Sequence, residues 1–261
     1  MKNIWAIIVL TMTNLLRSRV YLGLVFFMLL MLAASQLFSY FTFEEEIKIV
    51  MDVGLAGLTM MGLLTAVFTT AWSLPTDLEQ KTLFMVLSYP VSKTQILLGK
   101  FISCSLSVLC NLFFMGVMFW VLVLFKLQDK GVDFQYLSMQ LGKTFILIAM
   151  ESIVSVGILL LMSIYFTPVI NIVMFLFIFI LGHAAGMIEV AIIKTEFIFF
   201  SVIRFLFIFI PDLTYFNIRD AVVLNQVVSW HYVEWAVLYG GLYTGLMVAL
   251  SCYLFEKKEI V

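Results

Sequence analysis

Long apolar stretches separated by short polar breaks run through the chain. A helix needs about 20 apolar residues to cross the roughly 30 Å hydrocarbon core of a bilayer. Runs of that length predict six transmembrane helices, at about residues 20–41, 51–74, 96–125, 141–165, 168–190 and 232–255. A closed barrel is not expected, because barrel strands are short segments in which apolar and polar residues alternate.

Two other apolar segments do not fit a complete crossing. Residues 2–17 place Ile4, Ile8 and Met12 at helical spacing, which predicts a helix along the inner membrane surface. The alternative is that this helix lengthens the first span. Residues 197–210 are apolar but short, contain Arg204 and stop at Pro211, so we expect a re-entrant segment that enters one leaflet and returns.

Composition supports one membrane domain over residues 1–261. The sequence is 64% hydrophobic and 12% charged, far from the mixture found in soluble domains. The predicted fold class is therefore an all-α polytopic membrane protein. The net charge is -1, and no run of Lys or Arg exceeds two residues, so nucleic acid is not an expected partner. The three Cys and sixteen Met residues lack metal-ligand spacing, and no metal site is predicted.

Positive charges near the span ends predict the orientation. One side carries Lys2, Arg17, Arg19, Lys81, Lys93, Lys100, Lys257 and Lys258, whereas the short loops of the other side carry Lys48, Lys126, Lys130 and Lys143. The side with more positive charge should be cytoplasmic, which places both termini in the cytoplasm.

The cytoplasmic connection between the second and third spans predicts a short helix at about residues 77–88. Thr76 and Glu79 have the spacing of a capping box, and Pro90 cannot continue the helix. Apolar residues cover most of its circumference, which fits burial in a groove of a soluble partner. The alternative is a loop helix packed on its own membrane domain.

This segment resembles the signature of type-2 ABC-transporter permeases. The family pattern has acidic residues, then Gly-Thr-Leu, then Leu-Leu-Ser-x-Pro, then Ser-Arg. The positions of this chain that align with the pattern are Asp77, Glu79, Lys81, Thr82, Leu83, Phe84, Leu87, Ser88, Pro90 and Lys93. The chain departs from the pattern at Lys81, where the family usually has Gly, at Val86, where it has Leu, and at Lys93, where it has Arg.

The resemblance covers essentially the whole chain and implies a function. In the family this loop is the coupling helix, which docks on a cytoplasmic ATPase, and two permeases assemble with two ATPases in the bacterial inner membrane. Short outer-leaflet helices are expected between the fifth and sixth spans. The run that starts Pro211-Asp-Leu-Thr-Tyr-Phe-Asn-Ile-Arg is similar to a subgroup that includes the permease of the nitrous-oxide-reductase maturation system. An exporter is expected.

The chain has no phosphate-binding loop of the Gly-x-x-x-x-Gly-Lys-Ser/Thr type. ATP and Mg²⁺ are therefore expected in the partner ATPase, and this chain is not expected to be an enzyme. Two alternatives stay open: a transporter that is independent of ATP, or an intramembrane enzyme. The latter needs a nucleophilic serine motif such as Gly-x-Ser-x-Gly, which the sequence does not contain.

A few polar residues interrupt the predicted spans. Glu151 falls near mid-bilayer, where an ionised acid costs several kcal/mol unless it is paired, so it is the leading candidate for the substrate path. His183, Asn111 and Asn171 could join it, and the alternative for Glu151 and His183 is structural hydrogen bonding. The pairs Gly182/Gly186 and Gly241/Gly245 have the spacing of close helix packing, within one chain or between two copies.

Overall fold

The computed structural model describes residues 2–17, 46–79, 92–127, 134–193, 210–224 and 226–258, and the single residues 23, 26, 30 and 33. Within these ranges all regular structure is helical. Five helices are long and apolar enough to cross a membrane, over Lys48–Pro75, Lys93–Phe125, Gln135–Met162, Pro168–Ala185 and Trp230–Lys257. The all-helical fold class is confirmed, with five candidate spans in the described part of the chain.

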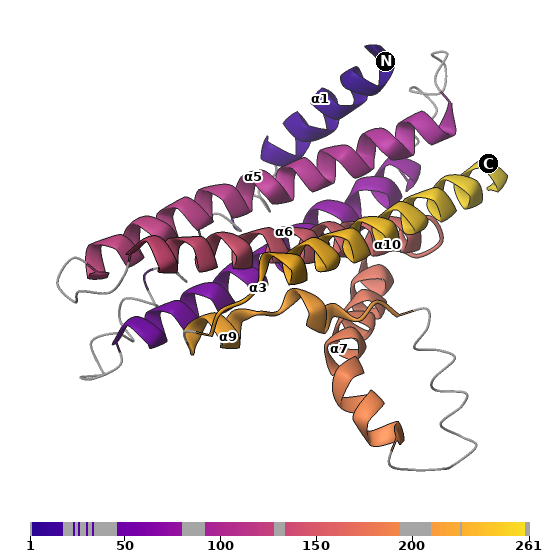
Figure 1. Ribbon diagram of the computed structural model, residues 1–261. Helices are drawn as coiled ribbons and strands as arrows, with labels where there is room; N and C mark the ends of the chain where they lie inside the picture. Colours follow the sequence, from indigo (N-terminus) through magenta and orange to yellow (C-terminus); the bar gives the residue numbers. More distant parts are fainter. Residues whose placement is uncertain are drawn as a thin grey trace.

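The helices follow the order of the predicted spans (Figure 1). Their bounds are α1 (Lys2–Arg17), α3 (Glu46–Glu79), α5 (Lys93–Leu127), α6 (Phe134–Met162), α7 (Pro168–Ile193), η1 (Leu213–Phe216), α9 (Arg219–Val223) and α10 (Trp230–Lys257). The second, third, fifth and sixth predicted spans thus correspond to α3, α5, α7 and α10. The short helices η1 and α9 lie between the last two spans, where short helices were expected.

The fourth predicted span starts too late. Helix α6 begins at Phe134, whereas the prediction began at 141 and assigned Lys143 to a loop. Lys143 is buried inside the helix, with its Nζ donating to the Val228 carbonyl oxygen at 2.7 Å and 5.0 Å from the Trp230 ring centroid. A long side chain can bring its ammonium group to polar partners at a helix end, so a lysine did not mark the boundary.

Several predicted elements fall on residues outside the described ranges. They are the first span at 20–41 apart from its four single residues, the coupling helix from residue 80 onward, and nearly all of the re-entrant segment 197–210. The start of the coupling helix requires a correction. Helix α3 continues without a break through Pro75 to Glu79, so Thr76 does not begin a separate helix.

A buried lysine joins α5 to α3 near Pro75. A proline removes one backbone hydrogen bond, here the one to the Ala71 carbonyl oxygen. The ammonium group of Lys100, on α5, donates to the Ser73 carbonyl oxygen, and it lies 3.1 Å from the Ser73 hydroxyl. This buried lysine therefore links the two helices two residues before the proline.

Helix α1 lies along α5 (Figure 1). The Ser103 hydroxyl donates to the Ile8 carbonyl oxygen at 3.3 Å, and the Ser107 hydroxyl lies 3.0 Å from the Met12 sulfur. Both contacts advance by four residues in the same direction, so the two helices run parallel and side by side. The position of residues 2–17 relative to the membrane surface and to the first span stays a prediction.

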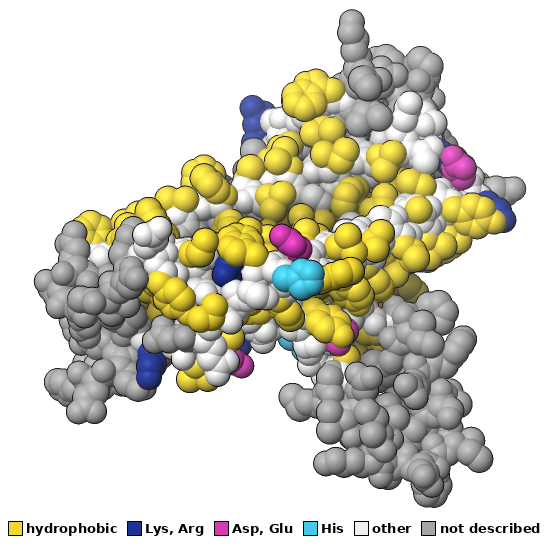
Figure 2. All heavy atoms as spheres, in the orientation of Figure 1, with side chains coloured by type: hydrophobic (Ala, Val, Ile, Leu, Met, Phe, Trp, Pro, Cys, Tyr) yellow, Lys and Arg dark blue, Asp and Glu magenta, His cyan; other side chains and the backbone are white. Residues whose placement is uncertain are grey.

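Helix α6 is central, packing against α3, α5, α7 and α10. Apolar side chains such as Leu147, Val154 and Leu159 fill its surroundings, and buried serines bond to carbonyls of their own helix, as Ser152 does to Ile148 at 2.8 Å. Hydrophobic side chains dominate the described part of the face drawn in Figure 2. Apolar groups both inside and outside are typical of a membrane protein.

Candidate functional site

A cavity of about 440 Å³ lies where α3, α6 and α7 meet the segment from η1 to α9. Helix α3 supplies Thr59 and Met60, α6 supplies Thr144 and Glu151, and α7 supplies Phe179 and His183. Phe216, Asn217, Ile218 and Arg219 close it from the last segment. Ionisable side chains on the wall of a cavity between membrane spans mark a candidate functional site.

Glu151 and His183 form the polar centre of this cavity. Glu151 Oε1 lies 3.3 Å from His183 Nε2, and the two side chains are 5% and 29% exposed. The contact does not have hydrogen-bond geometry, because Glu151 Oε1 has no hydrogen-bond partner among the residues that the structure describes. A small movement of either side chain would align the pair. The site therefore contains a carboxyl oxygen close to, but not bonded to, an imidazole nitrogen.

The other ring nitrogen constrains the proton on this pair. His183 Nδ1 lies 3.3 Å from the carbonyl oxygen of Phe179. If Nδ1 donates its proton to that carbonyl, Nε2 is left as an acceptor for a proton on the Glu151 carboxyl once the two groups align. A protonated carboxyl beside a neutral imidazole has the lower desolvation cost within a membrane segment, because neither group is charged. The arrangement can hold or release a proton.

Arg219 closes the cavity at the start of α9. Its Nε lies 3.5 Å from Asp52 Oδ1 on α3, and these side chains are 29% and 57% exposed. Buried Phe216 and Ile218 flank the approach to Arg219, and the Asn217 side chain accepts from the Arg219 backbone N–H at 3.3 Å. The cavity wall thus carries a guanidinium group as well as the carboxyl–imidazole pair.

Helix α10 fixes the segment that carries Arg219. The Asp212 side chain accepts from the Thr214 backbone N–H at 3.0 Å and caps η1. The Tyr239 hydroxyl accepts from the Asp212 backbone N–H at 2.9 Å, and the Tyr232 hydroxyl donates to the Tyr215 carbonyl oxygen at 2.9 Å. Two tyrosines of the last span therefore set the position of the cavity wall.

The four polar residues predicted for the path separate into two kinds. Glu151 and His183 lie together in the cavity, whereas the other two make interhelical hydrogen bonds elsewhere. Asn111 on α5 donates to the Thr65 hydroxyl at 2.6 Å. Asn171 on α7 donates to the Leu159 carbonyl oxygen at 3.1 Å. Each of these two asparagines thus links a pair of helices and does not line the cavity.

The predicted glycine pairs also separate. A Cβ atom at Gly182 would lie 2.7 Å from the Pro211 carbonyl oxygen, so this glycine permits close packing of α7 on the segment before η1 within one chain. At Gly241 and Gly245 a Cβ atom would meet nothing within 4 Å, so these two do not serve packing among the described residues. The surroundings of Gly186 are not among those that the structure describes.

The predicted ATPase-coupling residues lie largely outside the described ranges. Asp77 and Glu79 are in the last turn of α3, and Lys81, Thr82, Leu83, Phe84, Leu87, Ser88 and Pro90 are not described. Lys93 begins α5 and donates to the Lys258 carbonyl oxygen at 2.7 Å. Lys258 in turn donates to the Ile164 carbonyl oxygen. Lys93 thus joins the start of α5 to the end of α10, and Lys258 joins the end of α10 to the residues that follow α6.

Sequence reasoning did not single out Arg219 or Asp52. For Arg219, a usable signal was its place in the Asn217-Ile218-Arg219 run directly before the last span, the part of the chain for which a family resemblance was noted. Contact with Asp52, far away in the sequence, could not be found without the packing of α9 on α3.

No protein-family model matches the chain. No curated protein matches it either.

Proposed function

We propose that the chain is the membrane-spanning permease subunit of an ATP-driven ABC exporter. The observation that supports a transport function is the cavity between candidate spans, with Glu151, His183 and Arg219 on its wall. Such groups are costly in a membrane and are usually retained where a substrate or ion passes. The cavity has the size of a small-molecule site, so a small polar solute is the expected class of substrate.

The ATP-driven part of the proposal rests on the resemblance of residues 77–93 to a coupling helix. ATP and Mg²⁺ would be bound by a separate cytoplasmic ATPase, with two permeases and two ATPases in the bacterial inner membrane and both termini cytoplasmic. The contacts of Lys93 support a role for the start of α5 in transmitting force from the coupling helix to the membrane spans. A force on the connection before α5 would reach α10 and α6 through Lys93 and Lys258.

Copurification tests the docking helix. Leu83→Asp and Leu87→Asp place carboxylates on the face proposed to enter the ATPase groove, and an ATPase that stays bound to the wild-type chain should be lost from both variants. Leu224→Asp is the matched control, because Leu224 is an exposed leucine next to α9, where no ATPase contact is proposed. Equal retention by all variants contradicts ATPase docking on this helix.

A second candidate is a transporter that needs no ATP, and the Glu151–His183 contact favours it specifically. A carboxyl and an imidazole that share one proton inside a membrane can couple solute movement to a proton gradient. Liposomes containing the purified chain alone distinguish the two functions. Solute movement driven by an imposed pH gradient without an ATPase supports the second candidate, whereas movement only with ATPase and ATP supports the first.

A further inference from the structure

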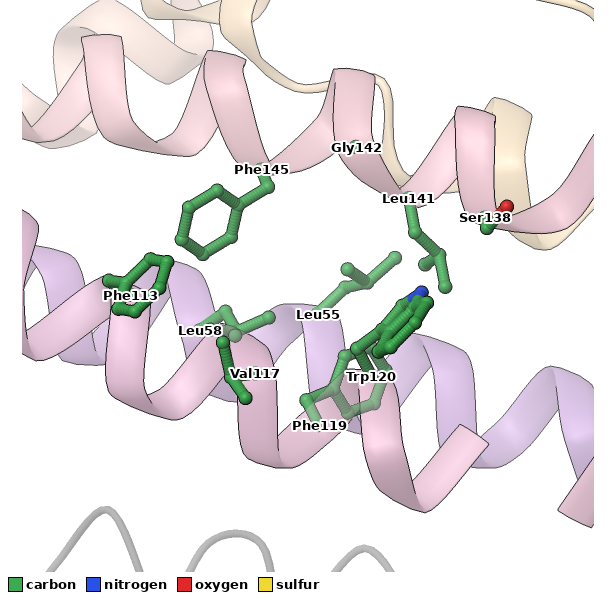
Figure 3. Close-up of a pocket in the computed structure, with 11 residues that line it drawn as sticks. Leu55, Leu58, Phe113, Val117, Phe119, Trp120, Ser138, Leu141, Gly142 and Phe145 are labelled. Carbon is green, nitrogen blue, oxygen red and sulfur yellow. The ribbon is translucent and has the colours of Figure 1, made fainter. Parts of the chain in front are cut away.

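A second cavity, of about 330 Å³, lies between α3, α5 and α6 away from the polar site. Its lining side chains converge from the three helices in Figure 3, with the rings of Phe113, Phe119 and Trp120 on one side and that of Phe145 on the other. Among the lining side chains, the heteroatoms are the Ser138 hydroxyl and the Trp120 indole nitrogen. The Ser138 hydroxyl donates to the Gln135 carbonyl oxygen at 3.1 Å, so the cavity is essentially hydrocarbon-lined.

Three glycines shape this cavity. A Cβ atom at Gly116 would lie 2.2 Å from the Phe145 ring, and one at Gly54 would lie 2.0 Å from the Phe119 ring. These glycines let the two rings pack deeply against neighbouring helices. A Cβ atom at Gly142 would meet nothing within 4 Å, although Gly142 lines the cavity. The missing side chain at this position leaves room for an occupant.

On the α5 side, three of the lining side chains are exposed. Phe113, Val117 and Trp120 are exposed on the outer face of α5, inside the apolar span Lys93–Phe125. From Phe113 to Trp120 the helix advances about 10 Å at 1.5 Å per residue, which covers much of one leaflet about 15 Å thick. Where α5 crosses a bilayer, hydrocarbon would surround this part of the helix.

The lining selects the occupant. Water is disfavoured in an apolar cavity because it finds no hydrogen-bond partners there. A charged head group would lose its hydration without compensation. A flexible hydrocarbon chain from the bilayer has the right polarity and reaches the opening without leaving the membrane. We propose that this cavity binds one acyl chain of a membrane lipid, between α5 and α6.

Tryptophan fluorescence can test this site directly, because Trp120 is one of only five tryptophans. Replacing Trp5, Trp72, Trp230 and Trp235 by Phe leaves Trp120 as the reporter in the full-length chain. The protein in detergent is titrated with phosphatidylcholine that carries bromine atoms on one acyl chain, which quench nearby indole fluorescence. Quenching should saturate as a single site fills.

Gly142→Leu in the same background fills the cavity and should raise the lipid concentration for half-saturation by about tenfold or more, equivalent to about 1.4 kcal/mol. Gly241→Leu is the matched control, since Gly241 also has open space around it but lies on α10. It should leave the titration unchanged. Val117→Phe, which fills the cavity from α5, is the second variant in case Gly142→Leu does not fold.

Three results would overturn the proposal. Quenching could rise in proportion to lipid without saturating, which indicates general solvation by lipid. Half-saturation could be the same with and without the cavity-filling substitution. Finally, glycerophosphocholine, which is the head group without acyl chains, could compete with the brominated lipid, which would place the binding energy on the head group. Each of these results is measured on the same single-tryptophan protein.

Discussion

The two cavities share the walls of α3 and α6 but differ in chemistry. On α3, Ala56 and Thr59 face the polar cavity, whereas Leu55 and Leu58 face the apolar one. On α6, Thr144 and Glu151 line the first, and Leu141 and Phe145 line the second. Adjacent residues on one helix point in different directions, so a single turn can serve two environments. The difference shows that the face of a helix, more than its overall hydrophobicity, determines what can enter.

The two cavities also carry different costs. Within the described part of the chain, the polar one leaves Glu151 Oε1 and Arg219 Nε without hydrogen-bond partners, which is unfavourable in a low-dielectric setting. The apolar one has no such cost, but its unfilled space forfeits packing contacts. Unsatisfied polar atoms favour a role in binding or transport, whereas unfilled apolar space favours an occupant from the bilayer. Substitutions that act on one cavity and not the other test this separation.

The largest effect is expected from Gly182→Leu. Its side chain would collide with the Pro211 carbonyl oxygen and with Leu213, pushing the segment that carries Arg219 away from α7. Overpacking against backbone costs about 1–3 kcal/mol, so the temperature of unfolding in detergent should fall. Transport by the folded protein should fall as well, because the polar cavity loses its wall.

Gly241→Leu is the control for the change in unfolding temperature, since a Cβ atom there meets nothing within 4 Å among the described residues. It should leave that temperature unchanged. Saturable quenching of Trp120 in the Gly182→Leu variant should persist, because the apolar cavity does not involve α7 or η1. Loss of that signal would show that the two cavities are not independent.

Glu151→Gln should have the next largest effect. Glutamine keeps the shape of the side chain but cannot share a proton with His183, so transport should drop by about tenfold, equivalent to about 1.4 kcal/mol. Stability should change little, because the carboxyl oxygen facing His183 already lacks a hydrogen bond. The measurement compares transport rates in liposomes with unfolding temperatures in detergent.

Ser155→Ala is a suitable control for Glu151→Gln, as the Ser155 hydroxyl bonds to the Glu151 carbonyl oxygen at 2.9 Å within the same helix and does not line the cavity. Wild-type transport in Glu151→Gln would make Glu151 a structural residue. The polar cavity would then lose its leading functional group.

Asn111→Leu tests whether the asparagines that link helices away from the cavity have a structural role. The substitution removes the interhelical hydrogen bond to Thr65, and such bonds are worth about 0.6–1.7 kcal/mol in membrane proteins. A modest decrease in unfolding temperature is therefore expected, with transport per folded molecule unchanged. A transport defect without loss of stability would return Asn111 to the list of path residues.

The sequence predicted the helical class and most spans because apolar length is a strong signal in lipid. Polar side chains made the boundaries less predictable, as Lys143 shows by lying inside α6 with a carbonyl partner. The site was half predictable. Glu151 and His183 stood out as ionisable residues in apolar runs, whereas the roles of Asn111 and Asn171 depended on which helix each side chain faces.

Contacts between distant residues were beyond the reach of the sequence pattern. The apolar cavity arises because Gly54 and Gly116 admit aromatic rings from other helices, and no periodicity within one helix encodes such a fit. The parallel packing of α1 on α5 likewise depends on tertiary contacts. Amphipathic spacing alone indicates an apolar face but not what covers it.

The smallest effect is expected at the ion pair on the rim of the polar cavity. Asp52 is more than half exposed and Arg219 Nε lies 3.5 Å from it, so the pair should contribute no more than about 0.5 kcal/mol. A double-mutant cycle with Asp52→Asn and Arg219→Gln isolates this coupling from the other contacts of each residue. Unfolding in detergent at low and high salt is the measurement. If water reaches this rim, the coupling energy should decrease as salt rises. A coupling that stays constant in high salt would mean that the rim is closed to water and that the polar cavity does not open there.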